Sequence, residues 1–156
     1  MSNEVEIKKN YLINGPMNET KKNNLHRNIE KIISGNTNAI IFGDKLMKPY
    51  ARVYIGITDD PATRISGHMR TYRKEMNKIR KNPHLILYHD SYLRRPDVFY
   101  LLYKDASRDI VGKYENHFLK YYSDYLDADP TKGNAGRRSS KNLPYYLYIF
   151  LQKFVI

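Results

Sequence analysis

The segment "ARVYIGITDDPATRISGH" at Ala51–His68 decides how the chain is interpreted. Its first half is apolar and rich in β-branched residues, which predicts a strand over residues 50–57. Asp60 is placed to cap a helix, and the proline that follows it suits the first helical position. Arg64 and His68 are four residues apart, so they share one face of that helix. Core packing does not require this combination, so the segment indicates a functional site.

The elements around this segment predict an α+β domain. The helix after Asp60 has apolar positions that return every three or four residues and therefore stay on one face. These positions are Ile65, Met69, Tyr72, Met76 and Ile79. The other expected elements are a helix at Lys21–Ser34, a short strand at Asn38–Phe42 that pairs with residues 50–57 as a hairpin, a buried strand at Val98–Tyr103, a helix at Asp109–Leu126 and a docked strand or helix at Leu143–Ile156.

We expect a small, mainly antiparallel three-stranded sheet flanked by helices. The chain divides into an N-terminal arm and helix at residues 1–36, a core at residues 37–136, and a basic and apolar extension at residues 137–156. That extension is expected to pack on the core or on a subunit interface.

The composition favours a polyanionic partner. The chain has 156 residues, a formal net charge of +11 and a pI of about 9.7. Nucleic acid is the commonest polyanion, although a general bias towards lysine and asparagine is the simpler alternative. Cysteine is absent, which excludes disulfides, thiolate zinc sites and a cysteine nucleophile. The first 15 residues have no signal-peptide core, and the most apolar run is too short to span a bilayer, so we expect a soluble intracellular protein without a membrane partner.

Glu115 breaks the pattern of its helix. On a helical wheel it is the one formal charge in the apolar half, among Val111, Phe118, Leu119 and Tyr122. A carboxylate in such a place is costly unless it is paired, hydrogen-bonded or bound to a metal. A structural ion pair with an arginine would explain the position of Glu115 as well as a metal site would.

Four side chains are predicted to converge on one concave surface. Tyr54 lies in the predicted strand, Arg64 and His68 open the next helix, and Glu115 faces inward from a later one. A hard carboxylate, a guanidinium and phenols suit the hydrolysis of a phosphodiester. The alternative is ordinary packing, with an arginine at the edge of the core and a histidine beside it.

At these residues the sequence resembles the GIY-YIG nuclease family. "VYIGITDDPATRISGH" is similar to the family's second strand and first helix, with Tyr54 opening the Tyr-Ile-Gly, Arg64 at the family's arginine and His68 at the histidine of some members. "KYENHFLKYY" is similar to the later helix, with Glu115 at the metal-binding glutamate. Asn134 in "KGNAGRR" resembles the asparagine that follows this helix. The similarity spans about residues 38–135.

One departure from the family concerns its Gly-Ile-Tyr half, on the strand before Tyr-Ile-Gly. The nearest segment here is "NAIIF" at Asn38–Phe42, which contains no tyrosine. In the family that phenol is thought to orient or deprotonate the attacking water. Tyr50 lies on the other strand and is one candidate substitute. His68 gains importance, because an imidazole can accept a proton or orient a phenol.

The resemblance implies a single-metal endonuclease that cuts DNA, most simply double-stranded DNA, by in-line attack of water. Glu115 would hold Mg²⁺ or Mn²⁺, Arg64 would stabilise the transition state, and Tyr54 would position water or phosphate. No separate recognition module is visible, which favours a restriction-type or phage-type enzyme over a modular homing enzyme. Cutting both strands with one site per chain favours a homodimer.

Two basic groups are expected to contact phosphates. The first lies on the helix after Asp60 and the second follows Asn134. Their members are Arg70, Arg73, Lys74 and Lys78, and Arg137, Arg138 and Lys141. A solvated helix face is the alternative. The tyrosines near the C-terminus are expected to fill a core or a subunit interface rather than to stack on bases.

Other readings compete with a GIY-YIG nuclease. The incomplete first motif allows a non-catalytic nucleic-acid-binding relative, and a structure-selective repair or recombination nuclease is a further alternative. "YLDADP" at Tyr125–Pro130 resembles the end of a LAGLIDADG helix, but it occurs once. "ENH" at Glu115–His117 resembles the HNH group, whose strand pair and first histidine are missing.

Overall fold

The computed structural model describes residues 5–36, 41–42, 45–46, 53–85, 95–121 and 144–151. The helices are α1 (Glu19–Asn36), α2 (Pro61–Lys81) and α4 (Arg108–Tyr121), with a short 3-10 helix at Pro83–Leu85. The strands are β1 (Ile7–Lys8), β2 (Ile13–Asn14), β3 (Ile41–Phe42), β4 (Lys45–Leu46), β5 (Val53–Thr58), β6 (Val98–Asp105) and β7 (Tyr145–Leu151). None of the helices in these ranges has the length and apolar character needed to cross a membrane.

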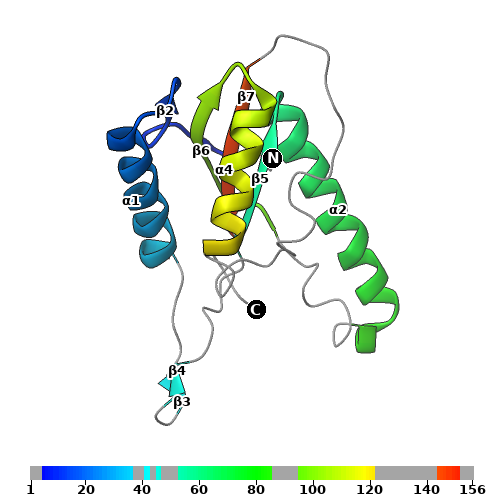
Figure 1. The fold of residues 1–156 in the computed structure, drawn as a ribbon. Coiled ribbons are helices and arrows are strands. Elements are labelled where there is room, and N and C mark those ends of the chain that lie inside the picture. Colours follow the sequence, from blue (N-terminus) through cyan, green and yellow to red (C-terminus); the bar gives the residue numbers. More distant parts are fainter. Residues whose placement is uncertain are drawn as a thin grey trace.

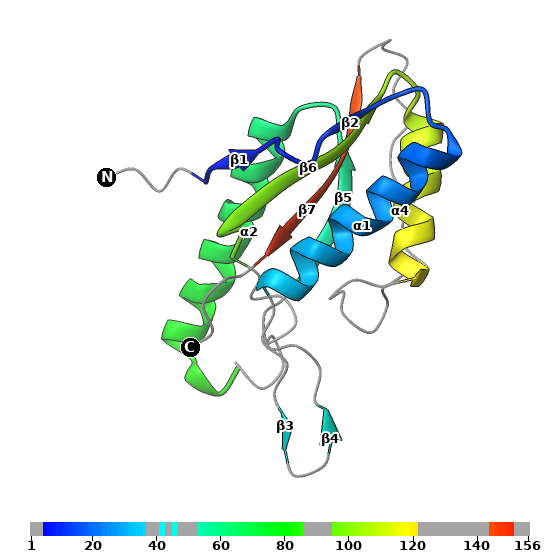
Figure 2. The same cartoon turned by 90° about the vertical axis from the view of Figure 1, so that its left-hand side faces the viewer.

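The main sheet is mixed and has the order β1-β6-β7-β5, with β2 also pairing with β6 (Figure 2). Strand β7 pairs antiparallel with both β5 and β6, whereas the two-residue strands β1 and β2 run parallel to β6. The α+β class is therefore confirmed. The sheet is larger than the expected three strands, because part of the expected N-terminal arm pairs with β6.

The expected hairpin between Asn38–Phe42 and residues 50–57 is wrong. Phe42 pairs with Lys45, so β3 and β4 form a separate two-stranded sheet. The two residues between them are glycine and aspartate, types that favour tight turns, and this local chemistry gives the shorter hairpin. Within the described residues β5 pairs only with β7 and is an edge strand.

Strand β7 is the inner neighbour of both β5 and β6, although it lies in the expected C-terminal extension. Its sequence, YYLYIFL, is apolar without alternation, and six of its seven residues are buried. A strand covered on both faces has this continuous pattern. A core that ends at residue 136 would lack this strand, so Tyr145–Leu151 of the expected extension is part of the sheet.

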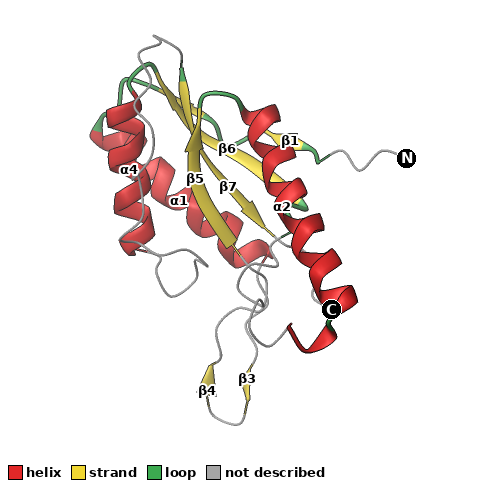
Figure 3. Cartoon of the chain, turned by 90° about the vertical axis from the view of Figure 1, so that its right-hand side faces the viewer, coloured by secondary structure: helices red, strands yellow, loops and turns green. Residues whose placement is uncertain are grey.

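Helices cover both faces of the sheet (Figure 1). On one face, Leu25 and Ile29 of α1 and Phe118 of α4 pack in one cluster with sheet residues that include Ile55 and Leu147. The other face carries α2. Its contacts there form a second cluster, which contains Ile65, Phe99, Leu101, Tyr148 and Phe150. Seen from the β5 edge, α2 and α4 lie on either side of β5 (Figure 3). Side chains from the two helices can therefore meet only at this edge.

Helices α1 and α4 are joined by a histidine pair. Nε2 of His26 lies 3.0 Å from Nε2 of His117, and the two rings meet edge to face. Burial lowers the pKa of His26, and Lys22 lowers it further while Glu30 opposes both. Burial, His26 and Lys22, in that order, lower the pKa of His117. The folded protein therefore favours two neutral rings, one donating to the other.

This pair predicts acid sensitivity of the fold. Because both pKa values are lower in the folded state, the unfolded chain takes up protons first as pH falls through about 6.5, and stability is lost over that range. We expect the melting temperature to be lower near about pH 5.5 than near about pH 7.5. The His117→Gln variant should show a smaller difference between the two pH values, whereas His84→Gln, at an exposed site, should behave like the unmodified chain. An equal difference in melting temperature between the two pH values in all three proteins would contradict the prediction.

Candidate active site

A short, tightly bonded connection places α2 against β5. The backbone N–H of Asp60 donates to Thr58 Oγ1 at 3.0 Å. The Asp60 side chain then accepts from the N–H and the hydroxyl of Thr63, at 3.2 Å and 2.7 Å. The predicted cap and the proline at the helix start are confirmed. This fixed start holds the first turns of α2, with Arg64 and His68, beside the strand that carries Tyr54.

The hydroxyl of Tyr148 joins the two polar residues of α2. Arg64 Nε donates to it at 3.1 Å, and His68 Nε2 lies 2.8 Å from it. The Tyr148 ring is fully buried between β7 and α2, as expected of a core residue. Its hydroxyl, however, belongs to the polar site. Tyr148 is therefore a site residue that the sequence motifs did not identify.

Gly56, the last residue of Tyr-Ile-Gly, makes room for this hydroxyl. Gly56 pairs with Tyr148 across the β5–β7 ladder. A Cβ atom on Gly56 would lie 2.6 Å from the Tyr148 hydroxyl oxygen and 3.0 Å from a ring carbon of Tyr54. A Cβ atom does not approach a non-bonded atom as closely as 2.6 Å, so any larger residue would displace the Tyr148 phenol. The glycine is explained by this contact.

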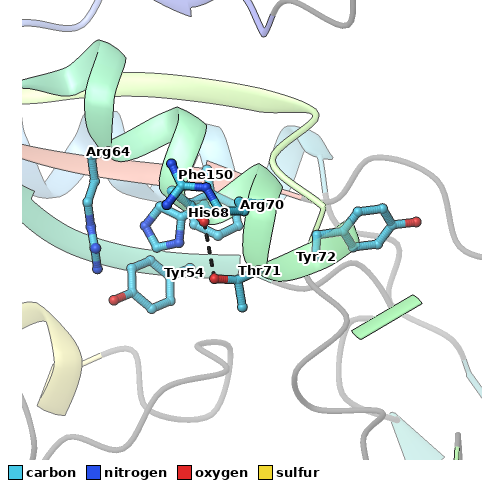
Figure 4. Close-up of a pocket in the computed structure, with 8 residues that line it drawn as sticks. Tyr54, Arg64, His68, Arg70, Thr71, Tyr72 and Phe150 are labelled. Atoms are coloured by element: carbon cyan, nitrogen blue, oxygen red, sulfur yellow. Dashed lines mark hydrogen bonds between the residues drawn. The ribbon is translucent and has the colours of Figure 1, made fainter. Parts of the chain in front are cut away.

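Aromatic rings form the floor of the site. Tyr54 lies 5.0 Å from Phe150 in a stacked arrangement and 4.8 Å from His68 edge to face, measured between ring centroids. These residues, with Arg64, line an open cavity of about 440 Å³ (Figure 4). Figure 4 shows the Arg64 guanidinium and the Tyr54 hydroxyl on the same side of this cavity. The structure thus brings together three of the residues singled out in the sequence.

Burial keeps the Tyr148 phenol protonated. Burial is the main cause that raises the pKa of Tyr148, Tyr54 and Glu115 raise it further, and Arg64 opposes them. For Arg64, partial burial lowers the pKa, but Tyr148 and Tyr54 outweigh it and the pKa is raised. At neutral pH the site therefore contains a guanidinium cation hydrogen-bonded to a neutral phenol.

Glu115 lies on α4, which covers the opposite face of the sheet from α2. Its side chain is only 7% exposed, and Val111, Phe118 and Leu119 of the same helix are buried with it. The position predicted from the wheel is confirmed. Its carboxylate is near enough to raise the pKa of Tyr148, so its charge acts on the hydroxyl that Arg64 and His68 contact.

The basic residues expected to contact phosphates fall into two groups. Arg70, Arg73, Lys74 and Lys78 are exposed on α2. Arg70 lines the cavity beside His68, and Lys78 forms an ion pair with Glu75 at 3.2 Å. The second group, Arg137, Arg138 and Lys141, lies outside the described residues, as do Asn134 and Tyr50.

Comparisons with known proteins neither support nor contradict the family resemblance. No protein-family model matches the sequence. Neither a curated protein nor a solved structure gives a match. The argument for function therefore rests on the residues and on the geometry of the site.

Proposed function

We propose that the protein is a divalent-metal-dependent endonuclease that hydrolyses phosphodiester bonds of double-stranded DNA by in-line attack of water. The observation that carries the proposal is the Tyr148 hydroxyl, which contacts Arg64 and His68 and lies within the influence of Glu115. The guanidinium of Arg64, the imidazole of His68 and the phenol of Tyr54 line one open cavity. The net charge of +11 suits a polyanionic substrate.

Arg64 is the group that stabilises charge. Its guanidinium stays protonated throughout the working pH range, and it lines the cavity while its Nε donates to Tyr148. A phosphoryl group that gains negative charge in the transition state would accept hydrogen bonds from them.

Tyr148 and His68 are the groups that handle protons. A guanidinium only donates, so the Tyr148 oxygen accepts from Arg64 and can donate its own proton to His68. In this arrangement the attacking water gives a proton to the phenol oxygen while the phenol gives its own proton to the imidazole, so the phenol stays neutral and His68 ends as the imidazolium. Tyr54 would position water or phosphate in the cavity.

Tyr148 would also replace the tyrosine of Gly-Ile-Tyr, which this sequence lacks. The family has that phenol on the strand before Tyr-Ile-Gly. Here the strand beside Tyr-Ile-Gly in the sheet is β7, which comes last in the chain. A tyrosine on the strand beside Tyr-Ile-Gly is thus supplied by the last strand of the chain rather than by the preceding one. This favours a catalytic protein over an inactive relative.

Glu115 fits the role of a metal ligand. It is a buried carboxylate on α4, the helix beside β5, and oxygen donors suit Mg²⁺ and Mn²⁺. The described residues contain no group of three or more histidine, aspartate or glutamate side chains placed to hold a metal. Mg²⁺ commonly has one or two carboxylate ligands, with water and substrate phosphate completing its shell. When bound, such a cation would polarise the phosphate.

The exposed basic residues of α2 are the proposed DNA contacts. They would give affinity that depends on salt and not on sequence. We also propose that Asn134 belongs to the site and that the basic group after it contacts phosphates. The proposed enzyme is a homodimer of the restriction type or phage type.

The direct test is cleavage of supercoiled plasmid by the purified protein. We expect nicked and linear products with Mg²⁺ or Mn²⁺ and none with EDTA. Binding that persists without cleavage under all metal conditions would instead indicate the non-catalytic alternative. Sequencing the ends of the products would then give the cut position.

The Tyr148→Phe variant is expected to cut about a hundredfold more slowly, because it removes a hydroxyl that contacts both Arg64 and His68 while keeping the buried ring. The measurement is the single-turnover cleavage rate at saturating protein. Tyr146→Phe is the matched control, since Tyr146 is a half-buried tyrosine of the same strand whose ring lies 5.6 Å from Lys104 Nζ. Equal rates for the two variants would exclude Tyr148 from the reaction.

A further inference from the structure

Gly67 lies within α2 at a position where packing does not require a glycine. It lies in the interior of the helix, where glycine is destabilising relative to alanine. A Cβ atom added at this position would meet no heavy atom within 4 Å. This is the opposite of Gly56, where the neighbours exclude a side chain. The fold therefore does not require the glycine.

The open space at Gly67 belongs to the candidate site. Gly67 lines the same cavity as Arg64, His68 and Arg70. Thr71, one turn further on, donates its hydroxyl to the Gly67 carbonyl at 3.1 Å, so this side chain is held against the helix (Figure 4). Gly67 is three residues from Arg64 and three from Arg70, so the helix between these two arginines carries no side chain at this position.

We propose that the sugar–phosphate backbone of the substrate strand runs along α2 over Gly67, with Arg64 and Arg70 contacting phosphates on either side of this glycine. This inference rests on the proposed nuclease function and adds the path of the strand. Glycine permits a ligand to approach the helix backbone closely. The two arginines are about 9 Å apart along the helix axis, which is the rise of two to three nucleotides of one strand.

The test combines stability with binding, because the two readouts should move in opposite directions. In Gly67→Ala the melting temperature should rise by about 3 °C, since alanine favours the helix. The dissociation constant for a short fluorescent DNA duplex, measured by anisotropy with Ca²⁺ in place of Mg²⁺, should increase about tenfold, because the methyl group occupies the path of the strand. Gly67→Leu should weaken binding further. Asn24→Ala is the control, since it improves helix propensity at an exposed site of α1, on the other face of the sheet.

Each outcome decides the inference. Higher stability with weaker binding in Gly67→Ala, and higher stability with unchanged binding in Asn24→Ala, supports it. If Gly67→Ala is more stable and binds as well as the unmodified protein, the strand path is wrong and the nuclease proposal stands. A less stable Gly67→Ala would show that the fold needs the glycine and would also overturn it. If the unmodified protein binds no DNA, both proposals fall.

Discussion

Replacing Glu115 with glutamine should abolish cleavage and leave DNA binding nearly intact. Glutamine keeps the shape of the side chain but removes the negative charge that a divalent cation requires. Because metal-ion stabilisation of a phosphoryl transition state is worth several kcal/mol, we expect the single-turnover rate to fall about a thousandfold or more. Binding of duplex DNA, which relies on the exposed cations of α2, should change by less than about twofold.

Two measurements separate this prediction from a loss of fold. Mn²⁺ affinity, followed by electron paramagnetic resonance, should fall in Glu115→Gln, while the melting temperature should fall little or rise, since a buried charge is removed. Glu30→Gln, at an exposed carboxylate of α1, is the matched control. Full activity of Glu115→Gln would remove Glu115 as the metal ligand and with it the single-metal mechanism.

Local signals in the sequence predicted the elements well but not their pairing. The Asp60 cap set the start of α2, and the continuous apolar run at residues 98–103 identified β6. The hairpin before β5 was wrong because strand partners are chosen by burial of whole faces, which a short apolar segment does not reveal. The strand beside β5 is about ninety residues away in sequence, as the pairing of Gly56 with Tyr148 shows.

The same limit explains which site residues could be found. Arg64 and His68 follow from spacing within one helix, and Glu115 from its place on another. Tyr148 has no local motif, and its role depends on the register that sets it opposite Gly56. One signal was available: Tyr146, Tyr148 and Phe150 alternate along β7 and must share a face, and a glycine in a strand often marks close approach of another group.

The second large loss of activity is expected at Arg64. Arg64→Ala removes the only guanidinium bonded to the Tyr148 hydroxyl within the described residues, so the charge that develops on the phosphate loses a donor. Removing one such donor typically costs about two to three orders of magnitude in rate. Arg64→Lys should recover little of it, because an ammonium group lacks the planar fork that contacts phenol and phosphate together.

The rate should be measured in a single turnover at saturating protein, so that weaker binding does not contribute. Arg27→Ala, at an exposed arginine of α1, is the control for loss of a positive charge. Because Arg64 and Tyr148 share one hydrogen bond, the double variant Arg64→Ala/Tyr148→Phe should be only slightly slower than Arg64→Ala alone. Fully additive losses would mean that the two side chains act separately, and an unchanged rate in Arg64→Ala would refute the role proposed for the guanidinium.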